Sequence, residues 1–314
     1  MPPFGEGGGR LLGMPPAPPD PLAPGTPAQA SSLVPKPPPK ADALVALLGG
    51  SALLLTLAAL VVWLAPAAFG DQPATCLTGP SARCFCEAVG TGLLRQPADS
   101  LSSLAFCIAA VTTAGRGRRL GRHTHERVLA PLAALTLLAL GAGSLAYHAQ
   151  LTFAGQLLDV QGMYLLGTLF VVGGLWRRGS LDAGRAATLA AALLAALLIA
   201  QALLPDARRW LFAIVLLPGI ILEWRLAPRS RPLGLAVLAL VVGYGAWLAD
   251  DHDLWCAPGS WLQGHALWHL LTALAGGLLA AHYGRTASRP RTASRPRTAA
   301  GHQNAPGTIA GGGG

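Results

Sequence analysis

The sequence has little charge. Asp, Glu, Lys and Arg make up 12% of its 314 residues, against roughly 25% in a soluble protein. This shortage excludes a soluble globular enzyme, because too few charged side chains remain to cover a water-facing surface. Cysteine is also scarce, and five residues can form one or two disulfides but not a disulfide-stapled scaffold. Hydrophobic residues make up 52% of the chain, which excludes a disordered protein.

Long apolar runs account for most of that hydrophobic content. Each is close to the roughly 20 residues that a helix needs to cross a bilayer. We therefore predict an all-α, polytopic membrane protein. Its eight spans are expected at 42–65, 98–115, 127–148, 156–175, 185–204, 209–225, 232–249 and 260–283.

The net charge of +9 is concentrated in short clusters between the apolar runs. Positive charge of this kind marks cytoplasmic loops, not a nucleic-acid surface. With eight spans all the clusters fall on one side, whereas seven or nine spans would divide them. We therefore expect both termini in the cytoplasm and no nucleic-acid partner. The clusters are Lys36 with Lys40, and the arginines within 116–127, 177–185, 225–231 and 285–297.

The two ends of the chain differ from its middle. Residues 1–41 are rich in Pro and Gly without sustained periodicity and predict a disordered arm. Residues 284–314 carry the repeat RTASRPRTASRPRTA and a glycine tail, which predict a disordered basic tail. Between them we expect a first helix at 42–65, an exoplasmic segment at 66–97 and seven further spans within 98–283.

Histidines inside two apolar runs are the first candidates for chemistry. His265 and His269 are four residues apart and so share one helix face. Helical metal sites present two imidazoles to one ion in this way. Ser144 and His148 repeat the spacing near the exoplasmic end of another helix. The alternatives are hydrogen-bonding histidines between helices and an interfacial histidine at 148.

Asp159 lies about one turn into a third apolar run, at the same predicted depth as His148. A carboxylate there needs a partner, and the alternative is a hydrogen bond that packs two helices. Taken together, three histidines with one open position predict a catalytic zinc site. Asp159 would take a proton from water and Ser144 would stabilise the oxyanion.

Four other acidic residues are expected to lie outside this site. Glu223 ends an apolar run beside Arg225 and predicts a surface charge. Asp250, Asp251 and Asp253 form an acidic loop, which we interpret as hydrated; the alternative is a cation site at the mouth of the bundle.

The segments SLAYHAQLTFAGQLLD, HALWH and CEAVGTGLLRQPADSLSSLAF resemble the alkaline ceramidase family. Its superfamily includes the progestin and adipoQ receptors and the Per1-like hydrolases. The similarity covers about residues 84–283. It implies a seven-helix bundle, to which 42–65 adds one N-terminal transmembrane helix. It also implies zinc held by His148, His265 and His269, with Ser144 and Asp159 lining the site. The implied reaction is hydrolysis of the N-acyl bond of ceramide-like lipids to a sphingoid base and a fatty acid.

Some members of that family bind calcium before the first core helix, and Glu87 is the candidate ligand here. One full carboxylate is few for an ion that takes about 6–8 oxygens. The alternative is that Glu87 and Asp99 cap or brace the bundle. Cys86 and Cys256 are both expected on the exoplasmic side, where disulfides persist, and are candidates for one bridge. Cys76 and Cys84 are candidates for a smaller one.

Two other functions stay open at this point. One is another lipid hydrolase of the same superfamily, acting on an ester or GPI-type lipid. The other is a non-enzymatic seven-helix receptor that keeps zinc as a structural tie. The composition is compatible with a high-GC bacterium, in which the exoplasmic face would be periplasmic. The sequence indicates neither the acyl-chain preference nor the oligomeric state.

Overall fold

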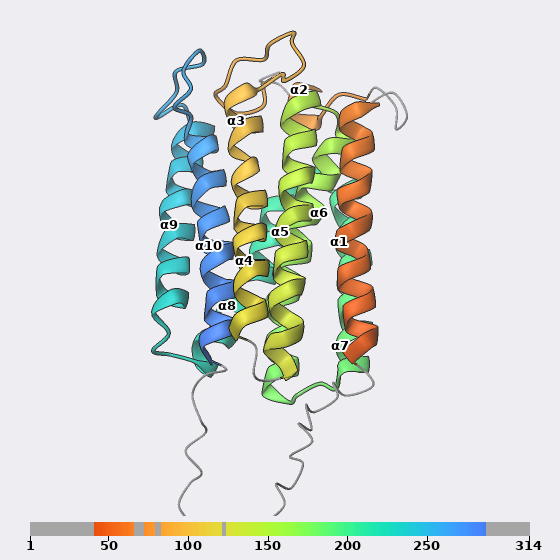
Figure 1. Ribbon diagram of the computed structural model, residues 1–314. Coiled ribbons are helices and arrows are strands. Elements are labelled where there is room, and N and C mark those ends of the chain that lie inside the picture. Colours follow the sequence, from red (N-terminus) through yellow and green to blue (C-terminus); the bar gives the residue numbers. More distant parts are fainter. Residues whose placement is uncertain (1–40, 66–71, 79–82, 121–123, 287–314) are drawn as a thin grey trace, which may run out of the picture. The chain divides into compact units, whose positions relative to one another are not determined.

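The computed structural model describes residues 41–65, 72–78, 83–120 and 124–286. The predicted arm and tail lie outside this part of the chain, except for residue 41 and residues 284–286. Within it, the regular elements are helices (Figure 1). One isolated β-bridge also pairs Pro73 with Thr152. They are α1 Ala41–Leu64, α2 Thr75–Thr78, α3 Pro97–Ser102, α4 Leu104–Leu120, α5 Thr124–Gln150, α6 Phe153–Arg178, α7 Ala183–Leu203, a 3₁₀ turn Pro205–Ala207, α8 Arg208–Leu226, α9 Arg231–Asp251 and α10 Gly264–Thr286.

Seven of the described helices are long and apolar enough to cross a membrane, with α3 and α4 counted as one continuous span. The prediction of an all-α polytopic membrane protein is confirmed. The one predicted span that is not among these seven is 209–225, which corresponds to α8. It is not counted because α8 has two charged residues near each end. Its 19 residues give a length of about 28 Å. That α8 also crosses the membrane stays a prediction.

Local signals in the sequence set where several helices begin and end. The Thr152 hydroxyl accepts the Gly155 amide at the start of α6, and the Asp182 carboxylate accepts the Arg185 amide at the start of α7. Gly179 ends α6 with φ 79°, a left-handed conformation that glycine adopts without steric cost. The last span begins at Gly264 and not at residue 260 as predicted, because residues 260–263 form part of the loop before it.

Helices α5 and α6 pack against each other through glycines. A Cβ on Gly143 would lie 2.8 Å from the Leu158 carbonyl oxygen, and one on Gly162 would lie 2.8 Å from Leu140 Cα. Small residues at such positions let two membrane helices approach backbone to backbone. The contact at Gly143 brings the neighbouring Ser144 beside the next residue of α6, Asp159.

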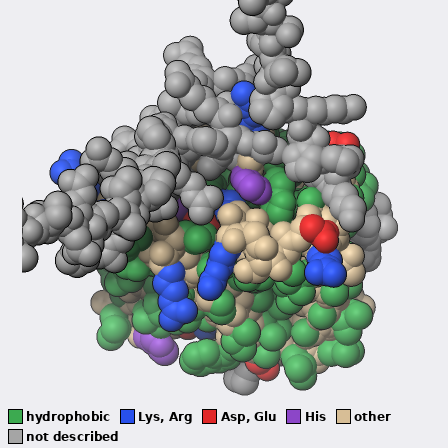
Figure 2. All heavy atoms as spheres, turned by 90° about the horizontal axis from the view of Figure 1, so that it is seen from below, with side chains coloured by type: hydrophobic (Ala, Val, Ile, Leu, Met, Phe, Trp, Pro, Cys, Tyr) green, Lys and Arg blue, Asp and Glu red, His purple; other side chains and the backbone are tan. Residues whose placement is uncertain are grey.

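The connections divide between the two ends of the bundle. The segments predicted as exoplasmic meet at the end where α2 lies, which we call the α2 end. There the Arg95 amide donates to the Ala149 carbonyl, and the Ala88 amide donates to the Pro258 carbonyl. The arginine-bearing connections lie at the opposite end, where basic side chains lie among hydrophobic ones (Figure 2). The basic clusters at 177–185 and 225–231 lie within the described residues and are at this end, as the eight-span topology predicts, whereas Lys36, Lys40 and residues 287–297 lie outside the described residues.

Glu223 lies at this opposite end, and the prediction that it is a surface charge is wrong. Its exposed fraction is 1%, and its carboxylate is paired with Arg177 and with His282, whose Nε2 is 3.1 Å away. The Ser230 hydroxyl lies 2.7 Å from the other ring nitrogen of His282. These partners join α6, α8 and α10, and a buried carboxylate needs such partners to offset its lost hydration.

Candidate metal centre

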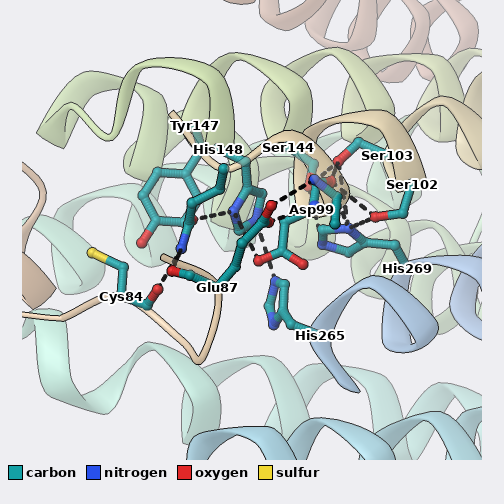
Figure 3. Close-up of polar contacts among 12 residues, drawn as sticks. Cys84, Glu87, Asp99, Ser102, Ser103, Ser144, Tyr147, His148, His265 and His269 are labelled. Carbon is teal, nitrogen blue, oxygen red and sulfur yellow. Dashed lines mark hydrogen bonds and ion pairs between the residues drawn. The ribbon is translucent and has the colours of Figure 1, made fainter. Parts of the chain in front are cut away.

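Three histidines meet inside the α2 end of the bundle. His148 is in the last turn of α5, and His265 and His269 are in the first two turns of α10 (Figure 3). Their exposed fractions are 0%, 5% and 4%. One nitrogen of each lies within 4.8 Å of the others, and Nε2 of His148 is 3.2 Å from Nε2 of His265. The structure thus brings together all three ligands expected from the sequence.

Hydrogen bonds set the tautomer of His148. Its Nδ1 lies 3.0 Å from Gln96 Oε1. The Gln96 Nε2 donates to the carbonyls of Cys84 and Glu87, so the amide oxygen is the atom that faces the imidazole. Because that oxygen can only accept, Nδ1 carries the proton and Nε2 presents its lone pair to the cluster.

His269 is set in the same way by α3. Its Nδ1 lies 3.1 Å from the Asp99 carbonyl and 2.8 Å from Ser102 Oγ. The Ser102 hydroxyl donates to the same Asp99 carbonyl, so it accepts from the imidazole. His269 Nε2 is therefore also unprotonated and faces the other two rings. Such outer hydrogen bonds are what orient histidine ligands in metal sites.

The three histidines could hold a metal ion, and the spacing of one pair matches that of zinc ligands. Two nitrogens at the usual Zn–N distance of about 2.0–2.1 Å in tetrahedral geometry lie about 3.3 Å apart, close to the 3.2 Å observed. The surroundings of Asp99 favour a positively charged ion at this site. It is fully buried, its Oδ2 is 3.9 Å from His148 Nδ1, and within the described part of the chain both carboxylate oxygens lack a hydrogen-bond partner. A buried, unpaired carboxylate is costly unless a cation is near.

Ser144 and Asp159 lie beside the histidines. Ser144 Oγ is 3.3 Å from His269 Nε2 and accepts a hydrogen bond from Ser103 at 3.0 Å. The Asp159 carboxylate accepts a hydrogen bond from the Ser144 hydroxyl. The five residues predicted for the site therefore come together from three helices, α5, α6 and α10.

Glu87 caps a helix. Its two carboxylate oxygens accept the backbone amides of Ala98 and Asp99 at 2.7 and 2.9 Å, at the start of α3. Burial raises the pKa of Glu87, and the two amides act against this shift. Both oxygens are already engaged, which favours the capping interpretation over a calcium ligand.

The acidic loop is hydrated only in part: the interpretation is wrong for Asp250, whereas the side chain of Asp253 is 55% exposed. Asp250 is fully buried, and its carboxylate accepts the amides of Cys86 and His265 at 2.9 and 3.1 Å. Asp253 pairs with Arg83 at 2.7 Å, which lowers the pKa of the carboxyl group. The loop is thus bound to the segment that precedes α3.

Two disulfides close the same segment. Cys86 is bonded to Cys256 with a Cα–Cα distance of 5.4 Å, and Cys76 is bonded to Cys84 with a Cα–Cα distance of 5.1 Å. These are the two pairings considered from the sequence. They attach residues 83–87 to α2 on one side and to the loop between α9 and α10 on the other.

Sequence reasoning missed Gln96, Ser102 and the unpaired carboxylate of Asp99 as parts of the site. The polar run QPADSLSS at the start of an apolar span was a usable signal, since its five polar residues need buried partners. Nothing in the sequence indicated which imidazole each would contact.

Replacing Asp99 with asparagine is expected to weaken zinc binding about tenfold, as is typical for a group outside the ligand set. The change removes a buried negative charge, so it should also raise the thermal unfolding temperature of the metal-free protein. Chelator competition and thermal unfolding measure the two effects. Glu87→Gln is the matched control and should lower stability without this loss of affinity. Unchanged zinc affinity in Asp99→Asn would show that the carboxylate does not balance the ion.

The fold and the site define a class of protein: a polytopic helical membrane protein with a buried group of three histidines. Residues 85–292, about two thirds of the chain, match the protein-family model described as Ceramidase, and the chain belongs to the ceramidase family. The resemblance seen in the sequence is confirmed. A search of curated proteins finds no match. Both α1 and α2 precede the matched region.

Proposed function

We propose that this protein is a zinc-dependent membrane amidase that hydrolyses the N-acyl bond of ceramide-like lipids. Membership of the ceramidase family supports a hydrolase for such lipids. The observation that carries the zinc-dependent chemistry is the buried group of three histidines, two of which direct unprotonated Nε2 atoms toward one point. We also propose that the α2 end faces the exoplasmic side, because the arginine-bearing connections lie at the other end.

His148, His265 and His269 would hold the ion. Bound zinc would supply Lewis-acid polarisation of the amide carbonyl and would lower the pKa of water toward about 7. The Ser144 hydroxyl donates to Asp159, and it becomes free to donate elsewhere once Asp159 has accepted the proton of the attacking water. We assign to Ser144 a hydrogen bond to the oxygen on which negative charge develops.

Asp159 would move the proton. Its carboxylate lies one hydroxyl group away from the histidines, since Ser144 contacts both. It would accept a proton from the attacking water and return it to the amide nitrogen as the C–N bond breaks. The products are then a carboxylic acid and an amine, which for ceramide are a fatty acid and a sphingoid base.

Detergent-purified protein is expected to release fatty acid and sphingoid base in equal amounts from an N-acyl sphingosine. Mass spectrometry of extracted lipids measures both products, before and after treatment with a zinc chelator and after zinc is restored. A matched O-acyl lipid tests the related ester hydrolase in parallel. Release from the O-acyl lipid alone, or no release from protein that contains about one zinc per chain, would contradict the proposed amidase.

A further inference from the structure

His265 differs from the other two histidines in what holds its ring. Within the described part of the chain, His265 Nδ1 is buried without a hydrogen-bond partner, whereas Nδ1 of His148 and of His269 each has one. A metal-binding imidazole normally donates this second N–H to a group that fixes its orientation. Another contact must therefore set the orientation of the His265 ring.

That contact is an aromatic ring. Phe85 stacks on the face of His265, with ring centroids 3.6 Å apart and an angle of 27° between the planes. The centroid of Phe85 is also 5.5 Å from that of His148. Rotation of the His265 imidazole about its Cβ–Cγ bond would drive the edge of the ring into Phe85, so the stacked ring restricts that rotation.

The backbone of Phe85 is itself fixed on both sides. Its neighbours Cys84 and Cys86 are each in a disulfide, to Cys76 and to Cys256. Phe85 has φ 64°, a left-handed conformation that is uncommon for a bulky residue and persists only where surrounding contacts impose it.

One carboxylate fixes this segment relative to His265. Asp250 accepts the amide of Cys86 with one oxygen and the amide of His265 with the other. The Cys84 carbonyl accepts from Gln96, the residue that also orients His148. The stacked ring is therefore held against its imidazole by covalent and hydrogen-bonded contacts with the same site.

We propose that Phe85 is a positioning residue: its ring, held by two flanking disulfides, keeps His265 in the metal-binding orientation where the other histidines use a hydrogen bond. The inference rests on the proposed zinc site. It assigns a role to a segment that lies outside the helices and makes no contact with the substrate's reacting atoms in the proposed mechanism. It also gives the Cys76–Cys84 disulfide a function, because that bond restrains Phe85 from the side of α2.

The test compares zinc affinity among variants of the full-length protein. Phe85→Leu should bind zinc at least tenfold more weakly in chelator competition, and Phe85→Tyr, which keeps the stacked ring, should stay within about threefold of the wild type. Cobalt substituted for zinc should show an altered visible absorption spectrum in Phe85→Leu and a normal one in Phe85→Tyr. Phe106→Leu is the matched control: Phe106 is 6.0 Å edge-on from His269, which has its own hydrogen bonds, so zinc affinity should be unchanged.

A second change keeps the proposal testable if Phe85→Leu does not fold. The double variant Cys76→Ser, Cys84→Ser leaves the Phe85 ring in place but releases its backbone on one side, and its zinc affinity should fall several-fold. Wild-type affinity and a normal cobalt spectrum in Phe85→Leu, or in the double variant, would overturn the positioning role alone. A wild-type protein that binds no zinc would overturn the proposed function as well.

Discussion

Asp159→Asn is expected to keep about one zinc per chain and to lower turnover by about 10²–10⁴-fold, the usual contribution of a general base. Asp159 is not one of the three ligands, so the ion should remain. Asparagine has nearly the same shape and can still accept a hydrogen bond from Ser144. It cannot accept a proton from water at neutral pH. The loss should therefore appear in kcat, with little change in KM.

Steady-state hydrolysis of an N-acyl sphingosine, with zinc measured on the same sample, tests this expectation. Asp206→Asn is the control, because Asp206 is an exposed carboxylate at the same end of the bundle and should be replaceable without effect. Full activity in Asp159→Asn would show that the carboxylate is not the base. Loss of zinc would show that Asp159 belongs to the ligand set, which also counts against its proposed role.

Much of the site could be predicted from two local features of the sequence. One is the four-residue spacing of polar side chains along a helix, and the other is the free-energy cost of a charged group in an apolar span. His265 and His269 lie on one helix face because they are four residues apart. A carboxylate such as Asp159 rarely lies in an apolar span without a function. The depth of these residues followed from arginine positions elsewhere in the chain. Periodicity and charge therefore predicted that these residues of three helices lie at the same depth in the membrane, before any contact between the helices was known.

What the sequence could not indicate depends on contacts between distant segments. Glu223 reads as a surface charge beside Arg225, yet it is buried because Arg177 and His282 reach it from two other helices. Asp250 reads as part of a hydrated loop, yet it binds two backbone amides, one of them 164 residues away. No local sequence pattern indicates that Phe85 contacts a histidine, because its position depends on two disulfides and on its left-handed backbone conformation.

His269→Ala is expected to remove zinc and to reduce hydrolysis to the level of the chelator-treated protein. Two histidines would remain, one ligand fewer than a catalytic zinc site has. His282→Ala is a demanding control, because His282 is buried on the same helix and pairs with Glu223 at the opposite end. It should lower the thermal unfolding temperature yet keep the zinc. Zinc content and unfolding temperature of both variants therefore separate loss of the ion from loss of stability.

The same experiment tests the alternative that zinc is only a structural tie between helices. A structural zinc supplies the free energy of folding, so its removal unfolds the protein. Here α10 is held without an ion, because its buried residues Ala273, Ala275 and Leu279 belong to the main core together with Leu137 of α5. Metal-free wild type and His269→Ala should both remain folded, with similar unfolding temperatures. If chelation unfolded the wild type, the ion would be part of the core of the fold, and the proposed chemistry would lose its main support.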